Sequence, residues 1–149
     1  MQEPAFRRRD EIAVIVIDHA PVNALAQPVR AALLAAIESA ESDPVVRAIV
    51  IHGAGRHFVA GADIREFDHD PRAPLLNDVL LRLEAATKPV IAALHGSVLG
   101  GGFELALACH FGRMSRSACR KYVSASCRAR AVRSVCRGSS GLRRRSRSC

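Results

Sequence analysis

Apolar residues recur along the first two thirds of the chain in blocks that alternate between strand-like and helix-like spacing. Residues 12–18 and 45–52 are short runs rich in β-branched side chains, and residues 90–94 form a third such run. Runs of this length and composition predict buried strands. The run at 45–52 is nearly continuous, which is typical of a strand covered on both faces.

Helical spacing follows each predicted strand. Pro28 suits the first turn of a helix, and the sequence Ser42-Asp43-Pro44 ends it. The apolar stripe of this helix consists of Val29, Leu33, Ala36, Ile37 and Ala40. A second helix is predicted over residues 75–86, and a third from Phe103 onward. Strand and helix thus alternate three times, which predicts an α/β fold with crossover connections between its strands.

Composition and charge change abruptly near residue 111. Residues 1–111 hold 10 basic and 14 acidic residues, a net charge of −4, whereas residues 112–149 hold 12 basic residues and no acidic one. This tail is mainly Arg, Ser, Ala and Cys, and it has too little apolar surface to offset the entropy of ordering. We therefore expect a folded part over residues 1–111 and a disordered, Arg/Ser/Cys-rich tail over residues 112–149.

Several classes of protein are disfavoured by the composition. No apolar run approaches the roughly 20 residues of a transmembrane helix, so no membrane partner is expected. The N-terminal residues lack a signal-peptide core, which makes the cytoplasm the default location. The five cysteines form no Cys-x-x-Cys pair, and the six histidines are scattered, so we expect no metal site.

The strongest candidate site is the run HGSVLGGGFE at residues 95–104, where a predicted strand leads through a glycine turn into a helix. The start of a helix presents unpaired backbone N–H groups and partial positive charge, which can hold a developing oxyanion. Glu104 lies one helical turn past Gly101, so its carboxylate would face the same pocket. The same pattern also suits a plain tight turn whose glutamate complements the helix dipole.

A second candidate is FVAGADI at residues 58–64, which follows a predicted buried strand. Its small residues leave the backbone accessible to a ligand. Asp63 suits the cap of a following helix, so a plain capped loop explains this segment equally well when it is taken alone.

Taken together, these segments resemble the crotonase superfamily, which includes enoyl-CoA hydratases and isomerases. The resemblance rests on HFVAGADIREF at residues 57–67, on KPVIAALHGSVLGGGFELALAC at residues 88–109, and on PVNAL at residues 21–25. The combination looks most like the N-terminal half of bifunctional enoyl-CoA hydratase/3-hydroxyacyl-CoA dehydrogenase proteins of fatty-acid β-oxidation. The resemblance covers residues 10–111 and implies an incomplete crotonase-like ββα spiral.

The resemblance also implies roles for particular residues. By motif position, the backbone N–H groups of Ala62 and Gly101 look like the oxyanion hole for a thioester carbonyl, and Glu104 matches the first of two catalytic glutamates. The wall that contacts coenzyme A would comprise Ala60, Gly61, Ala62 and Asp63. The substrate would be a 2-enoyl-CoA thioester, with no cofactor beyond the coenzyme A that it carries. The family forms homotrimers or hexamers, but the segments that build them have no match here.

The sequence departs from the family pattern after Glu104, which is its last acidic residue. The second glutamate of the family would fall near Ser124, within the basic tail. We interpret the tail as the product of a frameshift near His110, which would make the chain a truncated form; a genuine divergent tail is the alternative.

Two other functions remain open. The chain can be a non-catalytic acyl-CoA-binding remnant, since an acyl-CoA site needs no second carboxylate. The tail, with 11 Arg and one Lys, would also attract nucleic acids or other polyanions non-specifically. Tyr122 is its only aromatic residue, which argues against base stacking.

We predict that hydration of a 2-enoyl-CoA by this chain is severely impaired or absent. The family reaction uses two carboxylates to position water and to handle its proton and that of the α-carbon, and only Glu104 is present. The measurement is the rate at which the isolated chain hydrates a 2-enoyl-CoA. A rate comparable with that of an intact hydratase would contradict this prediction. An isomerase-like reaction needs fewer acids and is not excluded by the same reasoning.

Overall fold

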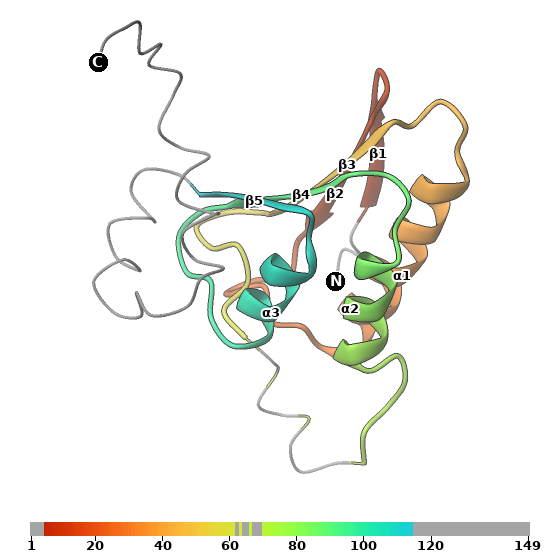
Figure 1. The fold of residues 1–149 in the computed structure, drawn as a ribbon. Coiled ribbons are helices and arrows are strands. Elements are labelled where there is room, and N and C mark those ends of the chain that lie inside the picture. Colours follow the sequence, from red (N-terminus) through yellow and green to blue (C-terminus); the bar gives the residue numbers. More distant parts are fainter. Residues whose placement is uncertain (1–4, 62, 64–65, 67–69, 115–149) are drawn as a thin grey trace, which may run out of the picture.

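The computed structural model describes residues 5–61, 63, 66 and 70–114, which form one mixed β-sheet with helices on one side (Figure 1). Among these residues, five strands lie side by side in chain order. They are β1 (Ala5–Arg9), β2 (Ile12–Ile17), β3 (Ala48–Gly53), β4 (Val90–Leu94) and β5 (Phe111–Met114). β1 and β2 form an antiparallel hairpin, and the remaining neighbours are parallel.

Each parallel pair of strands is joined through a helix, as the alternating pattern predicted. The helices are α1 (Gln27–Ser42), α2 (Leu76–Glu84) and α3 (Gly101–Ala108). All three lie on the same side of the sheet (Figure 1). None of the helices in the described part of the chain is long and apolar enough to cross a membrane.

The core lies between the sheet and these helices. Along β2 and β3, buried residues alternate with half-buried ones, so one face of the sheet is fully covered and the other only partly. The predicted stripe of α1 packs onto the covered face, and all five of its residues are buried. The expectation that residues 45–52 are covered on both faces was wrong for the described residues, because every described helix packs on the same face. Val50 and His52 are accordingly half-buried.

The two outer strands were missed by the apolar pattern. β1 has the sequence AFRRR, and its three arginines are exposed at the edge of the sheet, where charge discourages pairing with other chains. β5 continues to Met114 and pairs with β4 over residues 91–94. Residues 112–114, whose composition placed them in the predicted tail, are therefore strand residues, because pairing with β4 supplies the order that this composition lacks. The rest of the predicted tail lies outside the described residues.

Helix α3 begins at Gly101, two residues before its predicted start. Gly100 has a φ of 49°, a left-handed conformation that glycine adopts without strain, and it turns the chain into the helix. Glycines at the next two positions are poor helix formers, so the pattern placed the start too late. Packing explains their presence, since a Cβ atom at Gly102 would lie 2.5 Å from the carbonyl oxygen of Val59.

The connection between α2 and β4 is held by two charged side chains. The Glu41 carboxylate on α1 accepts hydrogen bonds from the backbone N–H groups of Thr87 (3.2 Å) and Lys88 (3.0 Å). The Lys88 ammonium group donates to the carbonyl oxygens of Ala40 (2.8 Å) and Asp43 (2.6 Å) at the end of α1, where a cation is favourable. This connection therefore depends on charge-assisted hydrogen bonds in addition to apolar contacts.

Acidification is predicted to weaken this anchor. Burial alone would raise the pKa of Glu41, but the hydrogen bonds from Lys88 and Thr87 and the charge of Arg82 outweigh it and lower the pKa below its ordinary value of 4.5. A carboxyl group whose pKa is lower in the folded chain stabilises the fold above its unfolded pKa. That contribution is lost as the pH falls through the folded pKa.

We predict that Glu41→Gln lowers the free energy of unfolding by roughly 1–2 kcal/mol at pH 7, the scale of charge-assisted hydrogen bonds. The difference from the parent chain should shrink as the pH falls through the lowered pKa of Glu41, because the parent carboxyl group then becomes neutral as well. Denaturant unfolding across a series of pH values from 7 downward measures this. Glu38→Gln is the matched control, because Glu38 is exposed on the same helix. Equal effects of the two substitutions at pH 7 would count against the anchor.

Candidate functional site

The structure brings together the two glycine segments singled out in the sequence. An isolated parallel bridge joins Val59 to Val98, and the N–H of Leu99 donates to the carbonyl oxygen of Val59 at 3.0 Å. A Cβ atom at Gly100 would lie 3.7 Å from the Cα atom of Gly61. Two segments about forty residues apart therefore meet backbone to backbone at one end of the sheet, beyond β3 and β4, which lead into them.

The PVNAL segment is the third component of this junction. The N–H of Ala60 donates to the carbonyl oxygen of Val22 at 3.1 Å, and the N–H of Leu25 donates to that of Gly61 at 3.0 Å. Residues 22–25 thus run alongside residues 60–61, between them and α1. All three motifs that carried the family resemblance are therefore in contact.

Asn23 explains why PVNAL belongs to this junction. Its buried side-chain amide donates to the carbonyl oxygens of Ala54 (2.9 Å), His57 (2.8 Å) and Phe58 (3.2 Å). Its side-chain oxygen accepts the N–H of His19 at 2.9 Å. The backbone φ of 55° is one that asparagine tolerates better than most residues. Asn23 thus holds the loop that leads from β3 to Gly61.

Gly101 lies at the first position of α3, where a backbone N–H has no acceptor within its own helix. The next three N–H groups, those of residues 102–104, do have acceptors among the described residues. They donate to the carbonyl oxygens of Leu99 and Gly100. The side chains of Leu25 and Leu76 cover Gly101, since an added Cβ atom would meet them at 3.4 and 2.8 Å. Gly101 is therefore a buried helix start beside Gly61.

The other predicted site residues are distributed around this junction. Ala60 is half-buried, and Gly61 is buried with a φ of 117°. Asp63 is half-buried. Glu104 is exposed in the first turn of α3. Ala62, the second predicted oxyanion-hole donor, lies outside the described residues.

A cavity of about 460 Å³ lies between the start of α1, the described residues 63, 66 and 70–72, and the start of α2. Its described lining residues are Gln27, Pro28, Arg30, Asp63, Glu66, Asp70, Pro71, Arg72, Leu75 and Leu76. Neither Gly101 nor Glu104 is among them. Leu76 both lines the cavity and covers Gly101, so it separates the cavity from the glycine junction.

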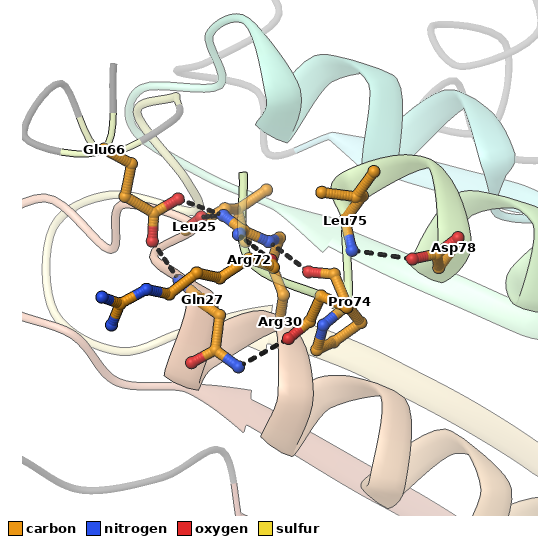
Figure 2. A network of polar contacts seen from close by, with 9 residues as sticks. Leu25, Gln27, Arg30, Glu66, Arg72, Pro74, Leu75 and Asp78 are labelled. Atoms are coloured by element: carbon orange, nitrogen blue, oxygen red, sulfur yellow. Dashed lines mark hydrogen bonds and ion pairs between the residues drawn. The ribbon is translucent and has the colours of Figure 1, made fainter. Parts of the chain in front are cut away.

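Arg30, which the sequence pattern did not single out, lines this cavity. Its polar contacts are shown in Figure 2. Its side chain is only 8% exposed and pairs with Glu66 at 2.7 Å. The signal was present in the sequence, because position 30 lies three residues before Leu33 and seven before Ile37, within the buried stripe of α1. A charged residue at such a position needs a partner of opposite charge or several hydrogen bonds.

Nucleophilic and metal chemistry find little support among the described residues. Burial raises the pKa of Cys109 to about 12, and its thiol donates to the carbonyl oxygen of Leu105 at 3.2 Å. A thiol in that state is a poor nucleophile. In the described part of the chain, no group of three or more His, Cys, Asp or Glu residues is arranged to hold a metal ion.

Comparisons with known proteins find similarity to enoyl-CoA hydratases and related enzymes. The sequence model of the enoyl-CoA hydratase/isomerase family matches residues 7–127. That range extends past residue 111, where the resemblance noted above ends. The chain is 51% identical over 100 residues to a peroxisomal bifunctional enzyme of Danio rerio, covering 67% of this chain and 14% of that protein.

A bacterial protein and a solved structure show similarity to the same family. A probable enoyl-CoA hydratase of Bacillus subtilis (strain 168) is 44% identical over 106 residues, covering 66% of this chain and 41% of that protein. The crystal structure of an enoyl-CoA hydratase/isomerase from Xanthobacter autotrophicus Py2 superimposes with a TM-score of 0.70 at 32% identity, covering 76% of this chain and 46% of that one. The chain therefore spans less than half the length of each of these relatives.

We predict that Asn23→Ala destabilises the fold by on the order of 3 kcal/mol, because it leaves buried carbonyl groups without donors. Asn23→Gly should be nearly as costly, although glycine tolerates the positive φ, since the hydrogen bonds are lost in both. Denaturant unfolding is the measurement. Asn77→Ala, at an exposed position of α2, is the matched control. If Asn23→Gly matched the stability of the parent chain, backbone conformation rather than hydrogen bonding would be what Asn23 supplies.

Proposed function

Because the chain belongs to the enoyl-CoA hydratase/isomerase family, we propose that it binds an acyl-CoA thioester and holds the thioester carbonyl at the junction of its two glycine segments. The donors would be the backbone N–H groups of Gly101 and Ala62. The contact between Gly61 and Gly100 is the single observation on which this proposal chiefly depends. It brings the residue before Ala62 next to the residue before Gly101.

The chemistry of this junction suits a carbonyl oxygen that becomes negatively charged. The start of α3 contributes partial positive charge as well as the Gly101 N–H. Backbone donors of this kind are already positioned before the reaction, and each is worth on the order of 2.7–4 kcal/mol in the transition state. The glycines leave the backbone open to close approach by the ligand. We assign contact with the coenzyme A portion to Ala60, Gly61, Ala62 and Asp63, as the motif implies.

The proposed substrate is a 2-enoyl-CoA thioester of fatty-acid β-oxidation, and the proposed reaction needs no separate cofactor. Resemblance to bifunctional proteins of that process, together with the identity to the Danio rerio enzyme, supports this choice. Cytoplasmic location stays a prediction, and the name of that relative gives a peroxisomal one.

Glu104 is the proposed first carboxylate of the reaction, on the exposed side of the first turn of α3. The position near Ser124, where the family resemblance places the second glutamate, holds no acidic residue. We therefore propose binding and polarisation of the thioester with little hydration. A purely acyl-CoA-binding role is the second candidate, and the same absence of a second carboxylate favours it.

The test is the infrared C=O stretch of crotonyl-CoA carrying ¹³C at the thioester carbon. We predict a shift to lower wavenumber on binding, because hydrogen bonds to the oxygen weaken the C=O bond. Gly101→Pro removes the N–H at a first helical position, where proline is tolerated, and should lose most of the shift at saturating ligand.

Gly101→Ala is the matched control for the added carbon atoms, since it meets the same Leu76 side chain but keeps the N–H. It should retain the shift. Equal shifts in the two variants would exclude Gly101 as a donor. No shift in the unaltered chain would refute the proposed function.

A further inference from the structure

The guanidinium group of Arg30 forms hydrogen bonds to segments that are far apart in the sequence (Figure 2). It donates to the carbonyl oxygens of Leu25 (2.6 Å), Pro74 (2.8 Å) and Arg72 (3.3 Å). It also donates to the Glu66 carboxylate at 2.7 Å. One buried side chain therefore connects the entry to α1, the segment at residue 66 and the chain that leads into α2.

Two of these contacts secure Glu66 and, through Leu25, Gly61. Glu66, bonded directly to Arg30, also accepts the N–H of Gln27 at 2.5 Å. The carbonyl oxygen of Gly61 accepts the N–H of Leu25. Because the carbonyl of Leu25 is itself held by Arg30, both Gly61 and Glu66 are tied to one guanidinium group.

The remaining contacts reach the opposite side of the glycine junction. Pro74 and Arg72 precede α2, whose first residue is Leu76. The side chain of Leu76 covers Gly101. The Leu25 side chain also reaches Gly101, because a Cβ atom added at Gly101 would lie 3.4 Å from it. Arg30 is thus linked through Leu25 to Gly61 and Gly101, and through the chain that leads into α2 to Leu76, which covers Gly101.

We propose that Arg30 is a positioning residue for the acyl-CoA site, which fixes Gly61 relative to the Gly101 N–H without touching the substrate. This inference rests on the proposed function. A planar guanidinium group can serve several acceptors in fixed directions, which a lysine ammonium group on a flexible stem cannot. Glu66 supplies the buried charge with its partner and ties residue 66 to the start of α1.

The experiment uses the same ¹³C-labelled crotonyl-CoA at saturating concentration. Under that condition the carbonyl shift reports donor geometry in bound, folded molecules and is insensitive to how many molecules are folded. Arg30→Met keeps the length of the side chain and removes every donor. We expect it to lose about half of the shift or more, because hydrogen bonds weaken steeply as their geometry departs from linear. Arg30→Lys should give an intermediate shift, since only the charge pair with Glu66 can persist.

Glu66→Gln provides a second variant in case Arg30→Met does not fold. It keeps the carbonyl contacts of Arg30, and the Glu66 side chain is 37% exposed, so folding should survive. It should lose part of the shift. Arg82→Met is the matched control, because Arg82 pairs with Glu41 at a distance of 3.5 Å and neither residue is part of the glycine junction. It should leave the shift unchanged.

The outcomes separate the two proposals. A full shift in the parent chain that persists in folded Arg30→Met, or in Glu66→Gln where Arg30→Met does not fold, would overturn the positioning role and leave the proposed function standing. No shift in the parent chain would overturn both. A graded loss from parent to lysine to methionine, with Arg82→Met unaffected, is the result expected if Arg30 sets the donor geometry.

Discussion

The loop after β3 and the turn after β4 approach each other so closely that there is no room for side chains between them. A Cβ atom at Gly102 would lie 2.5 Å from the carbonyl oxygen of Val59, and one at Gly53 or Gly96 would collide with the backbone of residues 56–58. Close packing of this kind cannot be relieved by changing a rotamer, because backbone meets backbone. The rest of the site depends on this contact, since it sets Gly61 beside Gly100 and directs the start of α3 toward the same point.

Two buried polar side chains hold this contact in place from the other side. Asn23 secures the loop before Gly61 through three carbonyl groups, and Arg30 secures Glu66 directly and Gly61 through Leu25. Buried donors of this kind are costly unless every partner is present. That requirement favours one arrangement of the loops over others, which suits a site whose donors must be positioned before a ligand binds.

In the proposed function, ligand binding and proton transfer depend on different groups. The crotonase-like α/β part contains both glycine segments and the helix start that would polarise a thioester. The acid–base chemistry of the family needs carboxylates at defined positions, and this chain offers Glu104 on the exposed side of α3 and no acidic residue near Ser124. Under the proposed function such a chain would bind more readily than it catalyses, because backbone donors require only the local fold.

The sequence by itself determined the α/β alternation, the central strands and the stripe of α1, because apolar periodicity reports directly on the face that each element buries. It also identified the two glycine segments, whose family resemblance is confirmed. It did not reveal β1 and β5, whose order comes from pairing with a neighbouring strand rather than from their own composition. It did not reveal the early start of α3, since glycine helix positions make sense only once Val59 is seen against Gly102. Only the tertiary structure decided the roles of Asn23 and Arg30, because three of the four partners of each lie more than thirty residues away along the chain and no local pattern encodes such distances.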